Sequence, residues 1–143
     1  MHFNRSTDYA LRALTYLALK HGELATITEI AETYDISRNH VMKIIYRLGQ
    51  FGFITTLRGK HGGLYLGRAP EDIIIGDVIR KMENDWTLVE CFHPEKSTCR
   101  IRPSCRLQTI LHNSLDAFLA VLDSYTLADL IEDEPALLHD LRT

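Results

Sequence analysis

Three cysteines are the residues of this chain with the clearest chemistry. Cys91, Cys99 and Cys105 are the only cysteines among 143 residues, and they lie within one stretch of fifteen. An odd number of thiols, in a chain whose start shows no export signal, disfavours a disulfide framework. The spacing also departs from zinc sites, which pair their ligands as Cys-x2–4-Cys. Three thiolates on one loop can surround a multi-iron cluster, so the pattern favours an iron–sulfur site over three buried structural cysteines.

Residues beside the thiols could complete such a site. Arg100, Arg102 and Arg106 carry positive charge that would offset the negative charge of a thiolate-ligated cluster. A site with three thiolates needs a fourth ligand. The local candidates are Glu90, His93 and His112. Each of these alone is more often a surface or packing residue, so the fourth ligand stays open at this point.

The charge of the chain is distributed unevenly. Residues 1–68 carry nine Lys and Arg against five Asp and Glu, whereas residues 69–143 carry seven against fourteen. The net charge of −3 therefore hides a basic first half. Such a half suits a module that binds a polyanion, although unequal halves also arise by chance.

The pattern of the first half predicts three helices followed by a hairpin. Apolar residues at helical spacing predict a first helix over about 7–20, capped by Ser6 or Thr7. Thr26 and Glu29 form a potential capping box before a short second helix. Ser37 is the expected cap of a third helix that ends near residue 50.

A β-hairpin is expected after Gly52. Residues 53–57 are mostly β-branched or aromatic, residues 64–66 are Leu-Tyr-Leu and are expected to be extended again, and a six-residue basic tip, 58–63, separates the two segments. Two helices joined by a tight turn and followed by such a hairpin define a winged helix-turn-helix. We therefore predict a mainly α fold with a two-stranded wing.

A winged helix places its third helix in the major groove of DNA and its hairpin on the flanking backbone. At the start of the third helix, residues 37–40 would meet base edges, since Asn39 can pair with adenine and Arg38 with guanine. The expected DNA contacts are Ser37, Arg38, Asn39, His40, Lys43, Arg47, Arg58, Lys60 and His61. Lys43 and Arg47 suit phosphates. A solvated basic face on a helical protein is the alternative interpretation.

The second half is expected to hold the cysteine loop and a dimerisation region, with a boundary between residues 1–70 and 71–143. We predict a short helix over about 76–82, extended backbone over 86–90, and a long helix from Pro103 to about Leu122. The apolar face of the long helix is too wide for a helix that lies alone on a surface. A last short helix that starts at Thr126 and Asp129, and a loosely held tail beyond Glu132, complete the chain. No stretch is apolar enough to span a bilayer, and we expect a cytoplasmic protein.

Over residues 2–132 the sequence resembles the IscR/NsrR family of winged-helix regulators. The matching segments are residues 7–12, 37–48, 58–63, 75–78 and 125–130, together with the three cysteines. Within the family, the NsrR branch is the closest likeness. The IscR branch has a histidine ligand to a [2Fe–2S] cluster where this chain has Gln108. The resemblance therefore favours [4Fe–4S], held by Cys91, Cys99 and Cys105 and by Asp8 of the other subunit.

The resemblance also implies a function: a homodimeric repressor that senses nitric oxide. Nitric oxide would react with the cluster, the Asp8 link would break first, and roughly palindromic operator DNA would be released. The resemblance implies no catalytic residues. Alternatives are an IscR-type regulator of iron–sulfur or redox status, a zinc- or thiol-based regulator, and, in a different class, a cluster carrier or electron-transfer protein. Asp8 could also be a plain acidic residue at a helix start.

Overall fold

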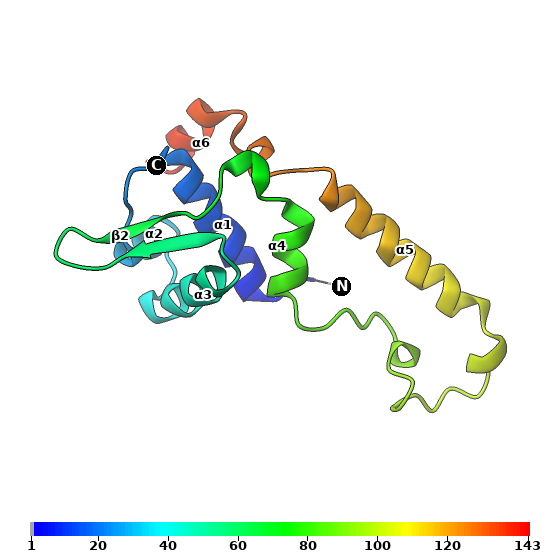
Figure 1. Cartoon of the computed structure of the whole chain (residues 1–143). Coiled ribbons are helices and arrows are strands. Elements are labelled where there is room, and N and C mark those ends of the chain that lie inside the picture. The colour runs from blue at the N-terminus through cyan, green and yellow to red at the C-terminus, as the bar shows by residue number, and fades with distance from the viewer. Residues whose placement is uncertain (1) are drawn as a thin grey trace.

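A computed structural model of the chain describes residues 2–143 and shows a mainly helical protein with one two-stranded antiparallel sheet. The helices and strands are α1 (Arg5–Leu19), α2 (Ile27–Thr33), α3 (Arg38–Gln50), β1 (Ile54–Leu57), β2 (Gly63–Leu66), α4 (Ile75–Met82), α5 (Arg106–Asp123) and α6 (Glu134–Asp140). In Figure 1, α1 to α4 and the hairpin form one body, and α5 stands beside it with the chain between α4 and α5 looping out at its far end. The predicted fold class is confirmed.

Local hydrogen bonds explain where the first three helices begin. The predicted capping box of α2 is present, with Thr26 N donating to Glu29 over 2.6 Å and Glu29 N donating to Thr26 Oγ over 3.1 Å. Ser37 caps α3 as predicted, accepting from the backbone of His40 over 3.3 Å. The prediction for α1 was wrong: Asn4 is the cap and accepts from Thr7 N over 2.9 Å. Thr7 is itself fully buried.

The hairpin follows the predicted pattern with one difference in its turn. Ile54 pairs with Leu66, and Leu57 pairs with Gly63, so Gly63 belongs to β2 and the tip comprises residues 58–62. The predicted six-residue tip is therefore one residue shorter. Gly59 has a φ of 114°, a conformation that favours glycine. A bridge between Ala25 and Leu64 fastens β2 to the start of α2.

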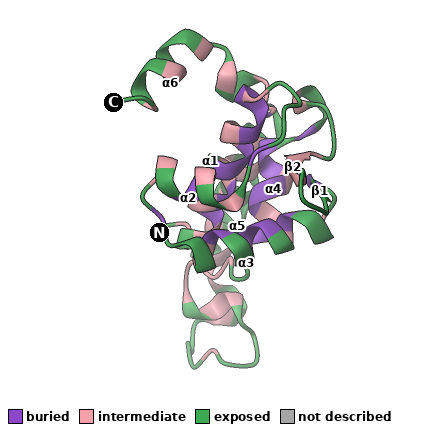
Figure 2. Cartoon of the chain, turned by 90° about the vertical axis from the view of Figure 1, so that its left-hand side faces the viewer, coloured by how far each residue is buried: buried purple, intermediate pink, exposed green. Residues whose placement is uncertain are grey.

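One hydrophobic core joins the helices of the body and extends past residue 70. Among its largest fully buried side chains are Leu14, Ile44, Phe53, Met82 and Leu127. Buried residues gather in the body, whereas the loop after α4 is half-buried or exposed (Figure 2). The domain boundary at residue 70 stays a prediction, although residues from both sides of it share this core.

Helix α5 differs from α1 to α4 because none of its residues is buried, a feature it shares with α6. It is anchored at its C-terminal end, where Arg80 of α4 forms a bidentate ion pair with Asp123, with nitrogen–oxygen distances of 2.5 and 2.6 Å. Close by, Ile75 N donates to the carbonyl of Tyr125 over 2.9 Å. The helix begins at Arg106 and not at Pro103, which lies in a separate 3-10 turn (Arg102–Ser104). Residues 86–90 form no strand.

The C-terminal segment is more ordered than the sequence suggested. Asp133 caps α6 by accepting from Ala136 N over 3.3 Å, and Glu134 lies 2.8 Å from Nε2 of His21 at the end of α1. Leu138 and Leu141 line a cavity of about 220 Å³ with residues of α1 and α2. The prediction of a loosely held tail was therefore wrong. No helix among residues 2–143 is long and apolar enough to cross a membrane.

Candidate nucleic-acid interface and cysteine loop

The outer face of α3 carries the polar residues expected to meet DNA. Four apolar residues, Val41, Ile44, Ile45 and Leu48, are buried on its inner side. Arg38, Asn39 and Lys43 are exposed on the other side. The body therefore fixes the axis of α3 through its apolar face and leaves its polar face accessible.

Two further residues on this face were missed by sequence reasoning. Met42 and Tyr46 are 51% and 68% exposed, and the Tyr46 hydroxyl accepts a hydrogen bond from Gln50 over 3.2 Å. Their spacing from Asn39, three and seven residues, could have indicated them, because those positions share a helix face. An apolar side chain there suits the methyl group of thymine.

Helix α1 supports the start of α3 through an aromatic contact. The ring of His40 lies edge-on to Tyr9, with centroids 5.1 Å apart. The guanidinium of Arg12 stacks over Tyr9 at 5.6 Å and forms an ion pair of 2.8 Å with Asp8. Asp8 is therefore paired within α1, the helix whose Tyr9 contacts the start of α3.

Arg47 points to the body, in contrast to the exposed basic residues of α3. Its Nη2 atom donates to the carbonyls of Lys81 and Met82, over 3.2 and 3.4 Å, and to the side chain of Asn84 over 3.3 Å. The expected phosphate contact of Arg47 would compete with these bonds.

The wing adds exposed positive charge at a distance from α3. Arg58, Lys60 and His61 are exposed on the tip, which projects from the body (Figure 1). At the base of the wing, Arg68 donates to the carbonyl of Phe51 over 2.9 Å and stacks on Phe53. This arrangement permits simultaneous contact with a groove and with the flanking backbone.

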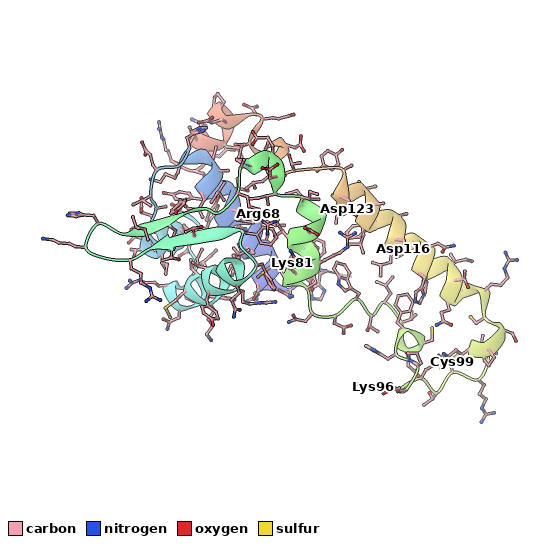
Figure 3. The ribbon with its side chains drawn as sticks, viewed as in Figure 1. Arg68, Lys81, Lys96, Cys99, Asp116 and Asp123 are labelled. Atoms are coloured by element: carbon pink, nitrogen blue, oxygen red, sulfur yellow. The ribbon has the colours of Figure 1, made fainter. Side chains whose placement is uncertain are left out.

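The cysteine loop, residues 83–105, connects α4 to α5. All three thiols are free, with Cys91 and Cys105 half-buried and Cys99 exposed. Figure 3 places Cys99 and Lys96 in this loop, well apart from Lys81 and Arg68 in the body. Gln108 Nε2 donates to the carbonyl of Cys91 over 3.1 Å and ties the first cysteine to the start of α5.

The loop offers the right ligand types without a preformed metal site. Three free thiols are the donors that iron–sulfur clusters require, so the chemistry of the residues fits. Across residues 2–143, however, no three His, Cys, Asp or Glu side chains are gathered closely enough to hold a metal ion. The thiols must therefore move together for all three to bind one cluster.

Each local candidate for a fourth ligand already has a partner. Glu90 accepts hydrogen bonds from the backbone and hydroxyl of Thr98, and the backbone bond holds the pKa of Glu90 below its usual range. His93 Nε2 lies 2.5 Å from the Thr87 hydroxyl. The Nδ1 atom of His112 lies 2.9 Å from the Gln108 carbonyl, and its ring lies against Phe92.

The arginines near the thiols differ in their surroundings. Arg102 donates to the carbonyl of Pro94 over 3.1 Å and so braces the loop. Arg100 and Arg106 are exposed. Two positive charges therefore remain available beside the thiols.

A winged helix with a basic outer helix and wing, joined to a cysteine loop, defines a class of helix-turn-helix transcriptional regulators. The chain belongs to the Rrf2 family of iron-dependent transcriptional regulators, whose family model matches residues 3–133. It is 51% identical to the HTH-type transcriptional regulator NsrR of Bacillus subtilis over 143 residues, covering 99% of this chain and 98% of that protein. It is 47% identical to NsrR of Geobacillus kaustophilus over 138 residues, covering 96% and 94%.

Solved structures agree with this assignment. T. potens IscR superimposes with a TM-score of 0.73 at 26% identity, covering 94% of this chain and 88% of that one. CymR, the global cysteine regulator of B. subtilis, superimposes with a TM-score of 0.70 at 30% identity, covering 91% and 95%. The predicted resemblance to the IscR/NsrR family, and to NsrR within it, is confirmed.

Proposed function

We propose that this regulator is a homodimeric repressor that binds an iron–sulfur cluster and releases operator DNA in response to nitric oxide. The observation that carries the proposal is the set of three free thiols on the loop between α4 and α5, in a chain 51% identical to NsrR over its length. The cluster, when bound, supplies iron that reacts with nitric oxide. The residues of the chain bind the cluster, read the DNA and connect the two.

DNA recognition is assigned to the exposed face of α3 and to the wing. The proposed contacts on α3 are Ser37, Arg38, Asn39, His40 and Lys43, and those on the wing are Arg58, Lys60 and His61. In support, these side chains lie at the cap of α3, in its first half or on the wing tip, and all but His40 are exposed. Removal of one bidentate base contact should cost about 1–3 kcal/mol.

The second copy of the chain is assigned to the outer face of α5. Exposed or small residues recur there at alternating spacings of three and four: Leu107, Ile110, Ser114, Ala117 and Val121. This is the spacing of a helix–helix seam, and the small residues at its centre allow two helices to approach closely. A two-fold axis across the seam would present both recognition helices to a roughly palindromic operator.

The proposed cluster ligands are Cys91, Cys99, Cys105 and Asp8 of the partner subunit, with [4Fe–4S] favoured over [2Fe–2S]. Gln108 supports this choice, because its amide is engaged with the carbonyl of Cys91 and has no imidazole to offer. A carboxylate from α1 of the partner would link the cysteine loop to the helix that supports α3.

Anaerobic purification followed by footprinting tests the proposal. We expect a brown protein with visible absorbance, bound iron and sulfide, which protects a palindromic site. A colourless zinc-bound protein that still binds DNA would favour the zinc or thiol regulator. A brown protein without a specific footprint would favour a cluster carrier or electron-transfer protein and would contradict the proposal.

A further inference from the structure

The C-terminal end of α4 is the point where the cysteine loop leaves the body. The last carbonyls of a helix have no partner within the helix, and this end carries the negative pole of the helix dipole. In this structure a side chain from the recognition helix, α3, donates to these carbonyls. Arg47 Nη2 lies 3.2 Å from the Lys81 carbonyl and 3.4 Å from the Met82 carbonyl.

A second residue caps the same end from a different helix. Asn4 Nδ2 donates to the Met82 carbonyl over 3.3 Å and to the Glu83 carboxylate over 3.0 Å, while its backbone N donates to Glu83 over 2.8 Å. The same Asn4 side chain caps α1 through its oxygen. The loop root, residues 81–84, is therefore fastened to α1 by Asn4 and to α3 by Arg47.

The contacts of Arg47 distinguish it from the other basic residues of α3. Its side chain is half-buried, and one nitrogen is shared among three acceptors, the third being Asn84 Oδ1 at 3.3 Å. Lys43, one turn earlier, is exposed and pairs with no acidic group among residues 2–143. A phosphate contact would require Arg47 to abandon the carbonyls at the end of α4.

We infer that Arg47 is a positioning residue, not a phosphate contact: it couples the loop root to the recognition helix, so that movement of the cysteine loop reorients α3. The inference rests on the proposed function, since it names the route by which that site controls DNA binding. When the three cysteines come together, the cysteine loop displaces residues 81–84. The hydrogen bonds of Arg47 and Asn4 transmit this displacement to α3 and to α1.

The test compares Arg47→Met with Lys43→Met by two measurements. The first is operator affinity as a function of salt, with and without the cluster. Arg47→Met should keep the salt slope of the unsubstituted protein. The ratio of operator affinities with and without the cluster should fall by at least about fivefold, which is the lower end of the coupling usually measured between two sites. Lys43→Met should reduce the salt slope by about 0.9 and leave the ratio unchanged.

Hydrogen exchange supplies a readout that needs neither cluster nor DNA. In the metal-free Arg47→Met protein, the amides of residues 82–86 should exchange faster than in the unsubstituted protein, and those of Lys43→Met should not. Arg47→Lys keeps the charge but loses the planar fork, and it replaces Arg47→Met if that variant melts early. A salt slope reduced by about 0.9 for Arg47→Met, with exchange unchanged in both Arg47 variants, would overturn the inference. Absence of operator binding by the unsubstituted protein would instead refute the proposed function, and the exchange experiment would still decide the role of Arg47 at the loop root.

Discussion

The outer seam of α5 makes a quantitative prediction about assembly. Ile110 is 53% exposed in the single chain and is the second of the five residues that we assign to the two-fold contact. Replacement by alanine should weaken the dimer without unfolding the body, because α5 contributes no buried residue to the core.

The magnitude follows from the area that the partner would cover. Full burial of an isoleucine side chain is worth about 1.5–3 kcal/mol, so covering the exposed half of Ile110 contributes roughly 1 kcal/mol. The substitution occurs in both copies, which gives about 2 kcal/mol for the dimer. At about 1.4 kcal/mol per factor of ten, the dissociation constant should rise by roughly thirtyfold.

Analytical ultracentrifugation over a range of protein concentrations measures this change. The matched control is Thr109→Ala, a β-branched residue exposed on the side of α5 away from the seam. The control should dimerise as the unsubstituted protein does. If Ile110→Ala and Thr109→Ala have the same dissociation constant, the seam lies elsewhere and our assignment of this face is wrong.

Three further predictions concern the ionic groups. Asp8→Ala should give a cluster that is labile or spectrally altered, whereas Arg12→Ala, which breaks the same ion pair but keeps the carboxylate, should not; identical spectra for Asp8→Ala and the unsubstituted protein would remove the ligand role. The Arg80 guanidinium holds the pKa of Asp123 below its ordinary value of about 3.9, so the stabilisation by this pair is present above that pH and lost as pH falls through the lower folded pKa. The difference in Tm between the unsubstituted protein and Asp123→Asn should therefore stay constant near neutral pH and shrink towards zero below about pH 4. A difference in Tm that persists to pH 2 would contradict this interpretation. For Lys43→Met, binding should weaken about equally at operator and unrelated DNA, as expected for a phosphate contact, and a loss confined to the operator would indicate base recognition instead.

Much of the winged helix could be predicted because its determinants are local. The capping box of Thr26 and Glu29, the cap at Ser37 and the apolar face of α3 each depend on residues within one or two helical turns. The hairpin was evident from the β-branched residues of its first strand and from its Gly-rich tip. The ligand set that joins the three cysteines with Asp8 was predicted from the resemblance to the family. The spacing of the cysteines alone left the fourth ligand open.

The features that sequence reasoning missed depend on partners far along the chain. Asn4 begins α1 in place of Ser6 or Thr7, and it is also held by Glu83, 79 residues away. Arg47 was assigned to phosphate because its partners are 34 to 37 residues downstream. The missed helix α6 had a local signal in its Asp133 cap and in Pro135 at its first turn.

The most direct test is a titration of nitric oxide into the anaerobic, iron-loaded protein with operator binding as the readout. We predict that binding falls in step with the loss of the cluster's visible absorbance, and that a Cys99→Ser protein shows no such response. Operator binding that persists after the cluster has fully reacted would contradict the proposal that this regulator senses nitric oxide.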